Sequence, residues 1–321
     1  MGKIKFRLAK PSDKYAIADL LTLSSSHLRP AGYWEWINTE KNFPGSFVVV
    51  TTYVDKVIGH YAISVRDYSI FGFVKKVGIA TQTVIHPSFR KLQILLDISN
   101  FVKDICLTKS LYMIIGFPND NLYKINTKLL GWRHMSDVTQ FEVDLNQLPA
   151  FKSDNQTLRV SEFNNDFNRL IEFNNKKNDN IRECSSVNNL NWRYFKHPLN
   201  HYIIFSSISD SASLVDGYIA LKLYYSSTGI KGHIMELSTY HDSGIMDSLF
   251  EAAVEYFQWA NCSSISMWIG KNDYKYNYIK NIGFKENSIK SHLQFLPLKE
   301  VYNEPLDIDY WDLSMKMSDA Y

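Results

Sequence analysis

The two halves of the 321-residue chain carry the same landmarks in the same order: a tryptophan ahead of a strand-like run, a glycine inside the next run, and a glycine that ends a helix-like run. The first-half members and their counterparts are Trp36 and Trp192, Gly59 and Gly217, and Gly131 and Gly283. Counterparts lie roughly 155 residues apart, and a nearly constant offset indicates a repeated structural unit. The sequence therefore predicts two tandem α/β (α+β) domains, residues 1-148 and 152-321, each a mixed central sheet flanked by helices.

The composition restricts the classes of function. Hydrophobic residues make up 45% and charged residues 21%, as in folded proteins. The net charge of +2, with dispersed Lys and Arg, gives no electrostatic case for a nucleic-acid partner. Three cysteines without CxxC spacing argue against disulfides or a zinc site and fit a reducing compartment. The start has no signal-peptide core and no apolar run could cross a bilayer, so we expect a soluble, cytoplasmic protein without a metal or a membrane partner.

A strand, a basic turn and a helix follow one another between Lys76 and Asn100. Alternating apolar residues run up to Ile85, a short basic turn contains Arg90 and Lys91, and helix-period leucines and isoleucines come next. The first turn of a helix presents unpaired backbone N–H groups with a partial positive charge, and basic side chains add to it. The pattern predicts a pyrophosphate site, although an ordinary strand-to-helix connection with a solvated turn would read the same way.

A second strand-like run, Leu111–Phe117, ends at an asparagine, and a helix-like run then stops at Gly131-Trp132. Over roughly residues 3–145 this order resembles the GNAT superfamily of acyl-CoA N-acyltransferases. In that family an Arg/Gln-x-x-Gly-x-Gly/Ala loop holds the pyrophosphate of CoA. The loop here keeps Arg90 but replaces both glycines, by Gln93 and Leu95. The resemblance implies an acetyl-CoA-dependent N-acetyltransferase.

The same resemblance implies which residues bind the cofactor. Backbone groups at the end of the strand would pair with the pantetheine arm, the basic turn would surround the pyrophosphate, and the asparagine after the second strand would contact CoA. The implied cofactor-binding residues are Val84, Ile85, Phe89, Arg90, Lys91, Leu92, Gln93, Ile94 and Asn119. A core role for the strand residues and a helix-cap role for Asn119 stay open as alternatives.

The catalytic candidates are chosen by residue type and position. The family places a tyrosine on the helix before the closing Gly-Phe, as the acid that protonates the CoA thiolate, and Tyr123 is the candidate here. In several members of the family, a glutamate on the strand that precedes the loop acts as the general base. That strand here carries Gln82 and Thr83, so His86 and His60 are the remaining candidates for the base. Each histidine also fits a purely structural role. We expect direct transfer, because no cysteine has a basic neighbour in sequence.

The acceptor and the second half are predicted less directly. Trp34 and Glu35 form an aromatic and acidic pair suited to stacking on a sugar or a base. The layout resembles GNATs of bacterial surface-polysaccharide (O-antigen, lipopolysaccharide) synthesis, which implies a small amine acceptor, a nucleotide-linked amino sugar. In the second half the turn reads His241-Asp242 with no basic residue, and an acidic turn would repel a pyrophosphate. The second domain is therefore expected to be structural or to contact the acceptor.

Two other functions fit parts of the sequence. Tandem GNAT-like domains also occur in amino-acid ligases that use aminoacyl-tRNA, although those enzymes need a basic surface. The missing loop glycines would also fit a non-catalytic binding protein whose CoA sites have decayed.

Overall fold

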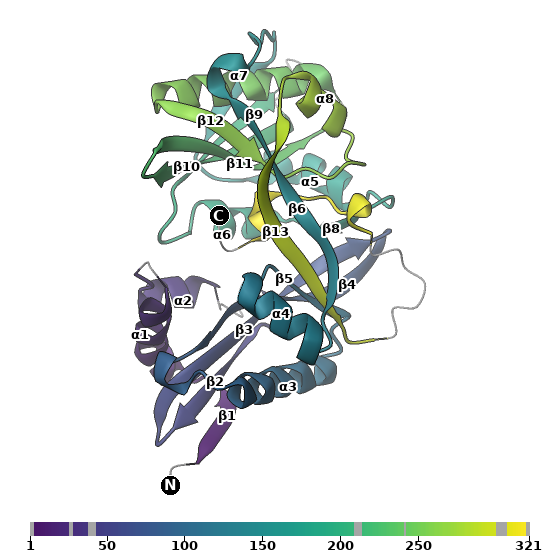
Figure 1. The fold of residues 1–321 in the computed structure, drawn as a ribbon. Helices are drawn as coiled ribbons and strands as arrows, with labels where there is room; N and C mark the ends of the chain where they lie inside the picture. Colours follow the sequence, from purple (N-terminus) through teal and green to yellow (C-terminus); the bar gives the residue numbers. More distant parts are fainter. Residues whose placement is uncertain are drawn as a thin grey trace. The chain divides into compact units, whose positions relative to one another are not determined.

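The computed structural model describes residues 3–25, 28–37, 43–208, 214–240, 242–299 and 307–318. The chain divides into two compact units (Figure 1). The first unit is made of Met1–Tyr68, Val74–Ser136 and His292–Glu304, and the second of Ser69–Phe73, Asp137–Ser291 and Pro305–Tyr321. His241, singled out in the sequence, lies outside the described residues.

The first unit is a mixed sheet between two layers of helices. Its strands are β1 (Ile4–Leu8), β2 (Phe47–Tyr53), β3 (Lys56–Ile70), β4 (Phe73–Ile85) and β5 (Met113–Gly116), and its helices are α1 (Lys14–Ser24), α2 (Ala31–Ile37), α3 (Leu92–Thr108) and α4 (Asp120–Leu129). Strand β1 pairs antiparallel with β2, β2 antiparallel with β3, and β4 parallel with β5. The chain leaves this unit along β6 (Arg133–Asp144).

Side-chain alternation decides which helices cover which face of the first sheet. In β2, Val49 faces the core that α3 closes, and its neighbour Val50 faces Ile17 of α1. Helix α3 buries Ile94, Ile98, Val102 and Cys106, which are four residues apart and so lie along one stripe. The apolar stripe predicted for this helix is confirmed.

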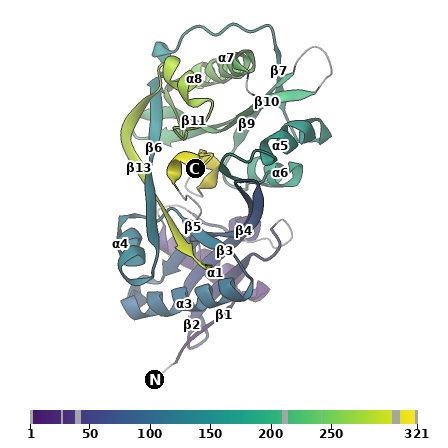
Figure 2. The same cartoon turned by 90° about the vertical axis from the view of Figure 1, so that its right-hand side faces the viewer.

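The second unit repeats the same order of elements. Its elements are β7 (Gln156–Val160), α5 (Asn168–Asn175), β8 (Ile181–Glu183), α6 (Val187–Tyr194), β9 (Tyr202–Ile208), β10 (Val215–Ser226), β11 (Gly229–Thr239), α7 (Ser243–Trp259), β12 (Cys262–Met267) and α8 (Tyr276–Asn281). The strand that follows, β13 (Lys285–Pro297), begins in this unit and continues into the first unit from His292. Single-turn 3-10 helices are Pro11–Asp13, Pro87–Phe89, Leu145–Gln147, Asn165–Phe167, Ile308–Tyr310 and Met315–Met317. Figure 2 shows α7 and α8 on one side of β10 and β11, with α5 and α6 on the other.

The repeated landmarks occupy equivalent positions in the two units. Trp36 and Trp192 lie in α2 and α6, and Gly59 and Gly217 lie in β3 and β10. The glycines that follow α4 and α8, at 131 and 283, have φ values of +73° and +106°, a left-handed backbone that ends a helix and favours glycine. The prediction of a mixed α/β fold with helix-flanked sheets is confirmed.

In each unit, the strand that pairs with the outer strand of the parallel pair comes from the other half of the sequence. In the first unit, Gln294–Pro297 of β13 pair antiparallel with Met113–Gly116 of β5. In the second, Phe141–Asp144 of β6 pair antiparallel with Ser264–Met267 of β12. By the order of elements, β6 would follow β5 and β13 would follow β12 within one copy. The compact units thus differ from the continuous ranges 1-148 and 152-321, because the last strand of each copy is exchanged.

Candidate functional site

In the first unit, the pairing between β4 and β5 ends before β4 reaches the basic turn. The parallel pairing covers Val77, Gly78 and Ile79, opposite Met113, Ile114 and Ile115. Beyond it, β4 continues to Ile85 and passes through Pro87–Phe89 into α3. The strand end, the turn and the helix start predicted from the sequence are therefore present, and they lie at the carboxyl end of a parallel strand pair, where ligands bind in open α/β sheets.

The start of α3 is open and basic. Its N-cap residue Lys91 makes no side-chain cap hydrogen bond. Arg90, Lys91, Leu92 and Gln93 are all exposed, so the helix start faces solvent with two cations beside it. The Arg90 Nε donates to the Ile85 carbonyl oxygen at 3.2 Å, which ties the guanidinium to the end of β4. An uncapped helix start with adjacent basic groups is suited to an anion.

The equivalent helix start in the second unit is closed. Asp242 is the N-cap of α7, and its Oδ1 accepts from Gly244 N at 2.7 Å and Ile245 N at 3.4 Å. These backbone N–H groups would be needed to hold a phosphate, and the carboxylate both occupies them and repels an anion. The two units thus differ in charge and in capping at the same place in the fold.

Several of the predicted cofactor residues use their side chains in the core. Ile85 and Ile94 are buried in the cluster beneath α3, and Phe89 packs against it. Val84 faces the other side, against the cluster of Ile17 and Val50. For the buried Ile85 and Ile94 only the backbone is left to contact a ligand. The core role that the sequence left open is thus present, and it leaves room for the pairing of an extended ligand arm with the strand.

The residues that replace the family glycines do not close the turn. Gln93 is exposed on the first turn of α3 and donates to Asp97 Oδ1 at 2.8 Å, while Leu95 packs against the core cluster. The Gln93 side chain is therefore held by the next turn of the helix, and the Leu95 side chain is directed into the core. The uncapped helix start, with Arg90 and Lys91 beside it, fits a pyrophosphate, and we take it as the candidate CoA site.

His60 is fully buried and hydrogen-bonded on both ring nitrogens. The Trp34 indole Nε1–H donates to His60 Nε2 at 3.2 Å, and His60 Nδ1 lies 2.8 Å from the carbonyl oxygen of Gln82. Burial lowers the pKa of His60 to about 4. The structure therefore brings two residues that the sequence proposed separately, Trp34 and His60, into direct hydrogen-bond contact.

His86 and Asn119 have local capping roles. The His86 Nδ1 accepts from Ser88 N at 3.2 Å and starts the single-turn helix before Arg90. Asn119 is the N-cap of α4, and its Oδ1 accepts from Leu122 N at 3.0 Å. The helix-cap role that the sequence left open for Asn119 is thus present, and its amide nitrogen takes no part in that cap.

Tyr123 lies in an aromatic group on α4. Its ring centroid is 4.4 Å from that of His292 and 5.4 Å from that of His134. The His292 Nε2 lies 3.1 Å from Asp120 Oδ1. His292 belongs to β13, so this neighbour of the candidate acid comes from a strand that the sequence assigns to the other domain. No short-range signal could have found it.

Trp34 and Glu35 line an open cleft in the first unit. The cleft has a volume of ≈ 540 Å³, and its other walls come from the end of β1, the start of α1 and the start of β2. Lys14 pairs with Glu35 at 2.9 Å on its rim. Trp36 instead is buried and stacks on Tyr33 with ring centroids 5.8 Å apart, which makes it a structural residue.

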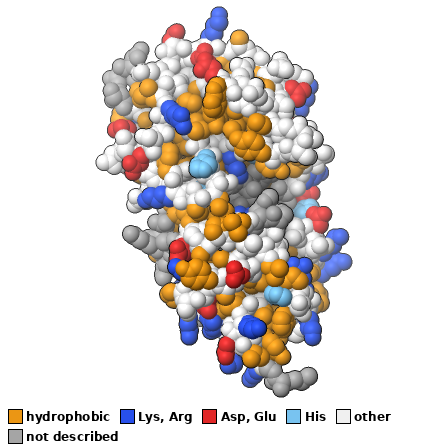
Figure 3. Space-filling view, turned by 90° about the vertical axis from the view of Figure 1, so that its left-hand side faces the viewer, with side chains coloured by type: hydrophobic (Ala, Val, Ile, Leu, Met, Phe, Trp, Pro, Cys, Tyr) orange, Lys and Arg blue, Asp and Glu red, His pale blue; other side chains and the backbone are white. Residues whose placement is uncertain are grey.

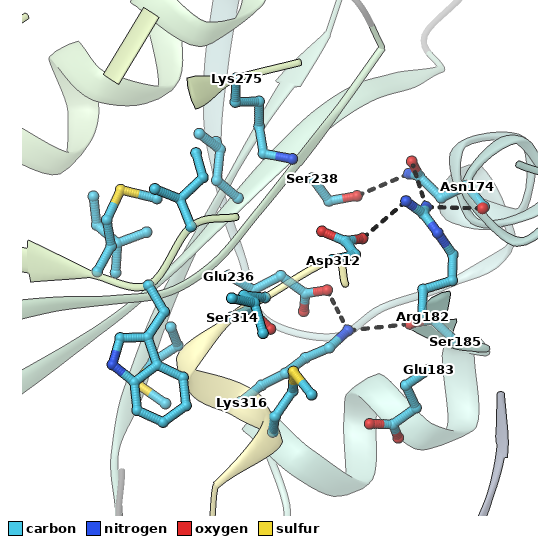
Figure 4. Close-up of a pocket in the computed structure, with 18 of the residues that line it drawn as sticks. Asn174, Arg182, Glu183, Ser185, Glu236, Ser238, Lys275, Asp312, Ser314 and Lys316 are labelled. Carbon is cyan, nitrogen blue, oxygen red and sulfur yellow. Dashed lines mark hydrogen bonds and ion pairs between the residues drawn. The ribbon is translucent and has the colours of Figure 1, made fainter. Parts of the chain in front are cut away.

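A narrow charged pocket lies in the second unit, at the ends of β11 and β12 (Figure 4). Its charged groups neutralise one another: Arg182 pairs with Asp312 at 3.0 Å, Lys275 with Asp273 at 2.8 Å, Lys316 pairs with Glu236, and the Tyr194 hydroxyl donates to Glu236 at 2.9 Å. The cavity has a volume of only ≈ 50 Å³. The network joins the segment around Asp312–Lys316 to the sheet.

Glu236 is a residue that the sequence analysis missed. It lies on β11, the counterpart of β4, on the strand where several GNATs carry a glutamate, whereas β4 carries Gln82. Comparing the two copies strand by strand would have found it. Its hydrogen bonds to Tyr194 and Lys316 give it a structural role in the network.

In the described ranges, no three or more His, Cys, Asp or Glu side chains are grouped so that they could hold a metal ion. Within the same ranges, no helix combines the length and apolar character needed to span a membrane.

The fold was compared with known proteins. No model of a protein family matches the chain, and no curated protein matches it. Solved structures do. A probable N-acyltransferase of unknown function from Enterococcus faecalis V583 has a TM-score of 0.72 at 10% identity over 92% of this chain and 72% of that one. GCN5-related N-acetyltransferases from Anabaena variabilis ATCC 29413 (TM-score 0.72, 10% identity, 92% and 73% covered) and Kribbella flavida (0.69, 10%, 92% and 71%) are also similar.

At these identities the likeness defines the fold: the chain has the fold of the GCN5-related N-acetyltransferases. The mixed α/β fold expected from the resemblance to the GNAT superfamily is therefore confirmed, and the likeness covers 92% of this chain.

Proposed function

We propose that this protein is an acetyl-CoA-dependent N-acetyltransferase whose CoA site is in the first unit. The observation that carries the proposal is the difference between the two helix starts. The start of helix α3 lies beside Arg90 and Lys91 and has no side-chain cap. The start of α7 is capped by the carboxylate of Asp242. The second unit would then support the fold through its paired charges.

The reaction proposed is direct transfer. The acceptor nitrogen attacks the thioester carbonyl, the C–S bond breaks, the nitrogen loses a proton and the CoA thiolate gains one. No acyl-enzyme is needed, and the buried Cys106 is a poor nucleophile, because burial raises the pKa of its thiol to about 12. An amine with a pKa near neutrality can lose its proton through water, so a strong base is not required. Initial rates with both substrates varied should give intersecting lines.

The acceptor proposed is a small amine, a nucleotide-linked amino sugar of surface-polysaccharide synthesis. The cleft lined by Trp34 and Glu35 supports it, because an indole offers a stacking face and a carboxylate can accept from a sugar amine or hydroxyl. On the face drawn in Figure 3, basic and acidic side chains of the described residues are interspersed with apolar and uncharged ones. The net charge of only +2 favours a small acceptor over a tRNA.

The test is acetyl-CoA binding by calorimetry to the parent and to the double variant Arg90→Ala/Lys91→Ala. Losing two charge-assisted contacts should weaken binding by about 1–3 kcal/mol. The matched control is Lys285→Ala/Lys290→Ala, which removes the same charge from two exposed positions of the second unit. Equal binding by parent and double variant would place the site elsewhere. A parent that binds no acetyl-CoA would favour the non-catalytic alternative. Acetylation assays with nucleotide amino sugars against simple amines then test the acceptor.

A further inference from the structure

Strand β4 contains one residue more than its alternation allows. Ala80 and Ile85 both pack against the core beneath α3, and Val84 faces the opposite side. Ala80 and Ile85 are an odd number of positions apart, so a regular strand would place their side chains on opposite faces of the sheet. The extra residue is taken up at Gln82, which has φ +53°, a left-handed conformation that a residue with a side chain adopts only under constraint. This is a β-bulge.

Two hydrogen bonds through one buried ring hold the bulge. An indole nitrogen can only donate, so the Trp34 contact at 3.2 Å requires a lone pair on His60 Nε2. The proton of the neutral ring is then on Nδ1, which donates to the Gln82 carbonyl at 2.8 Å. The geometry thus fixes one tautomer, and both nitrogens are engaged.

This arrangement leaves His60 unsuited to act as a base. Its only lone pair already accepts from Trp34, and the ring is 0% exposed. Burial lowers the pKa of His60 to about 4, so the ring is neutral at physiological pH and binds a proton weakly. The contribution of His60 must therefore come through the backbone that it holds.

Two buried polar atoms at the bulge have no hydrogen-bond partner within the protein. They are Thr81 Oγ1 and Gln82 Oε1. Thr81 is 8% exposed, and both residues follow the last β4–β5 pair, where the two strands have separated. Buried polar groups are nearly always paired, so atoms of this kind indicate a ligand or ordered water. A hydroxyl donor and an amide acceptor match in kind the carbonyl and N–H groups of an acyl-pantetheine arm.

We propose that His60, held by Trp34, is a positioning residue that fixes the bulge at Gln82 and so directs the Gln82–Ile85 backbone, with the Thr81 and Gln82 side chains, towards the thioester arm of acetyl-CoA. The inference rests on the proposed function. Trp34 also lines the cleft with Glu35, so the same indole connects the acceptor side to the strand that receives the donor.

The first test does not depend on activity. Nitrogen-15 NMR of the histidine rings between pH 5 and 8, with His60 assigned through the His60→Asn variant, reports tautomer and charge. The expected result is a neutral ring protonated on Nδ1 throughout this range. A ring that titrates near pH 6.5, or one protonated on Nε2, would contradict the proposed hydrogen bonds from Trp34 to His60 and from His60 to Gln82.

The second test separates positioning from loss of folding. His60→Ala should lower kcat/KM for acetyl-CoA by roughly 10- to 100-fold per folded molecule, because the backbone is no longer fixed. His60→Asn should recover most of this loss, because its amide can donate to Gln82 in place of Nδ1. The matched control is His233→Asn, a buried histidine of the second unit bonded to Ser266 Oγ at 2.6 Å, which should leave kcat/KM unchanged.

The pH profile completes the test. If His60 only positions, the acidic limb of kcat/KM is the same in the parent and in His60→Asn. A limb that disappears in the variant would show a base and contradict the proposal, as would full activity in folded His60→Ala. A parent that neither binds nor uses acetyl-CoA would instead contradict the proposed function. The NMR result would then still test whether His60 holds the bulge at Gln82.

Discussion

Asp312 lies in the second unit among cations. Its carboxylate pairs with Arg182 at 3.0 Å. Burial by itself would raise the pKa of Asp312, but the charges of Arg182, Lys275, Lys316 and Lys177 outweigh it and lower the pKa to about 2. The carboxylate therefore stays ionised in the folded protein at all ordinary pH values.

Removing this charge should destabilise the protein. Asp312→Asn leaves Arg182 buried without its anion, which we expect to cost about 3 kcal/mol, the lower end for broken buried pairs because 30% of the Asp312 side chain is exposed. Urea unfolding at pH 7 measures the loss, with Asp154→Asn, an exposed carboxylate, as the control. The folded pKa lies below the unfolded one, so the contribution is present above pH ~4 and disappears as pH falls towards ~2. A difference between parent and variant that is unchanged at pH 2.5 would contradict this assignment.

At the scale of elements, α3 and α7 are equivalent helices with different starts. The Asp242 cap satisfies two backbone N–H groups of α7, whereas α3 has no side-chain cap. A helix start left uncapped costs stability, and in α3 that cost is consistent with a site kept open for an anion.

The Asp242 cap gives a prediction for the second unit. Asp242→Ala should lower the free energy of unfolding by about 0.5–2 kcal/mol, the usual effect of losing an N-cap. It should not create a second acetyl-CoA site, because no basic side chain replaces Arg90 and Lys91 in this turn. Calorimetry should therefore give the same number of bound acetyl-CoA molecules in parent and variant. A second equivalent of ligand bound by the variant would mean that capping alone closes this site.

At the scale of the whole molecule, the exchanged strands make each half of the sequence incomplete. Fragment 1–148 lacks the β13 residues that pair with β5, including Gln294, which is 0% exposed and bonds Asn126 at 3.0 Å. Fragment 152–321 lacks β6, the partner of β12. Each fragment would expose an unpaired strand edge beside an open core.

We therefore expect neither fragment to fold alone. Expressed separately, each should aggregate or show no cooperative unfolding, whereas co-expression should give a soluble one-to-one complex. Size exclusion with light scattering and thermal unfolding would measure this. A monomeric fragment with a sharp transition would contradict the exchange as a stabilising feature.

The local elements and their repetition could be predicted from the amino-acid sequence. Apolar periodicity is a local property, so it sufficed for the strand into Ile85, the stripe of α3 and the glycine that ends α4. The spacing of Trp36 and Trp192 and of the glycines was enough to predict two similar units. The charge difference between Arg90-Lys91 and Asp242 could also be read directly, because turn residues next to a helix start act on it locally.

Partners that are distant in the chain could not be predicted, because they meet only in the folded protein. Strand order depends on which strand edges meet in the folded core. No local sequence pattern predicts that β5 pairs with β13 instead of β6. For the same reason the sequence could not place His292 beside Tyr123. His60 was a candidate base by residue type, but its protonation depends on burial and on what occupies its two nitrogens. Those neighbours, Trp34 and the bulge at Gln82, come together only when β3, β4 and α2 pack.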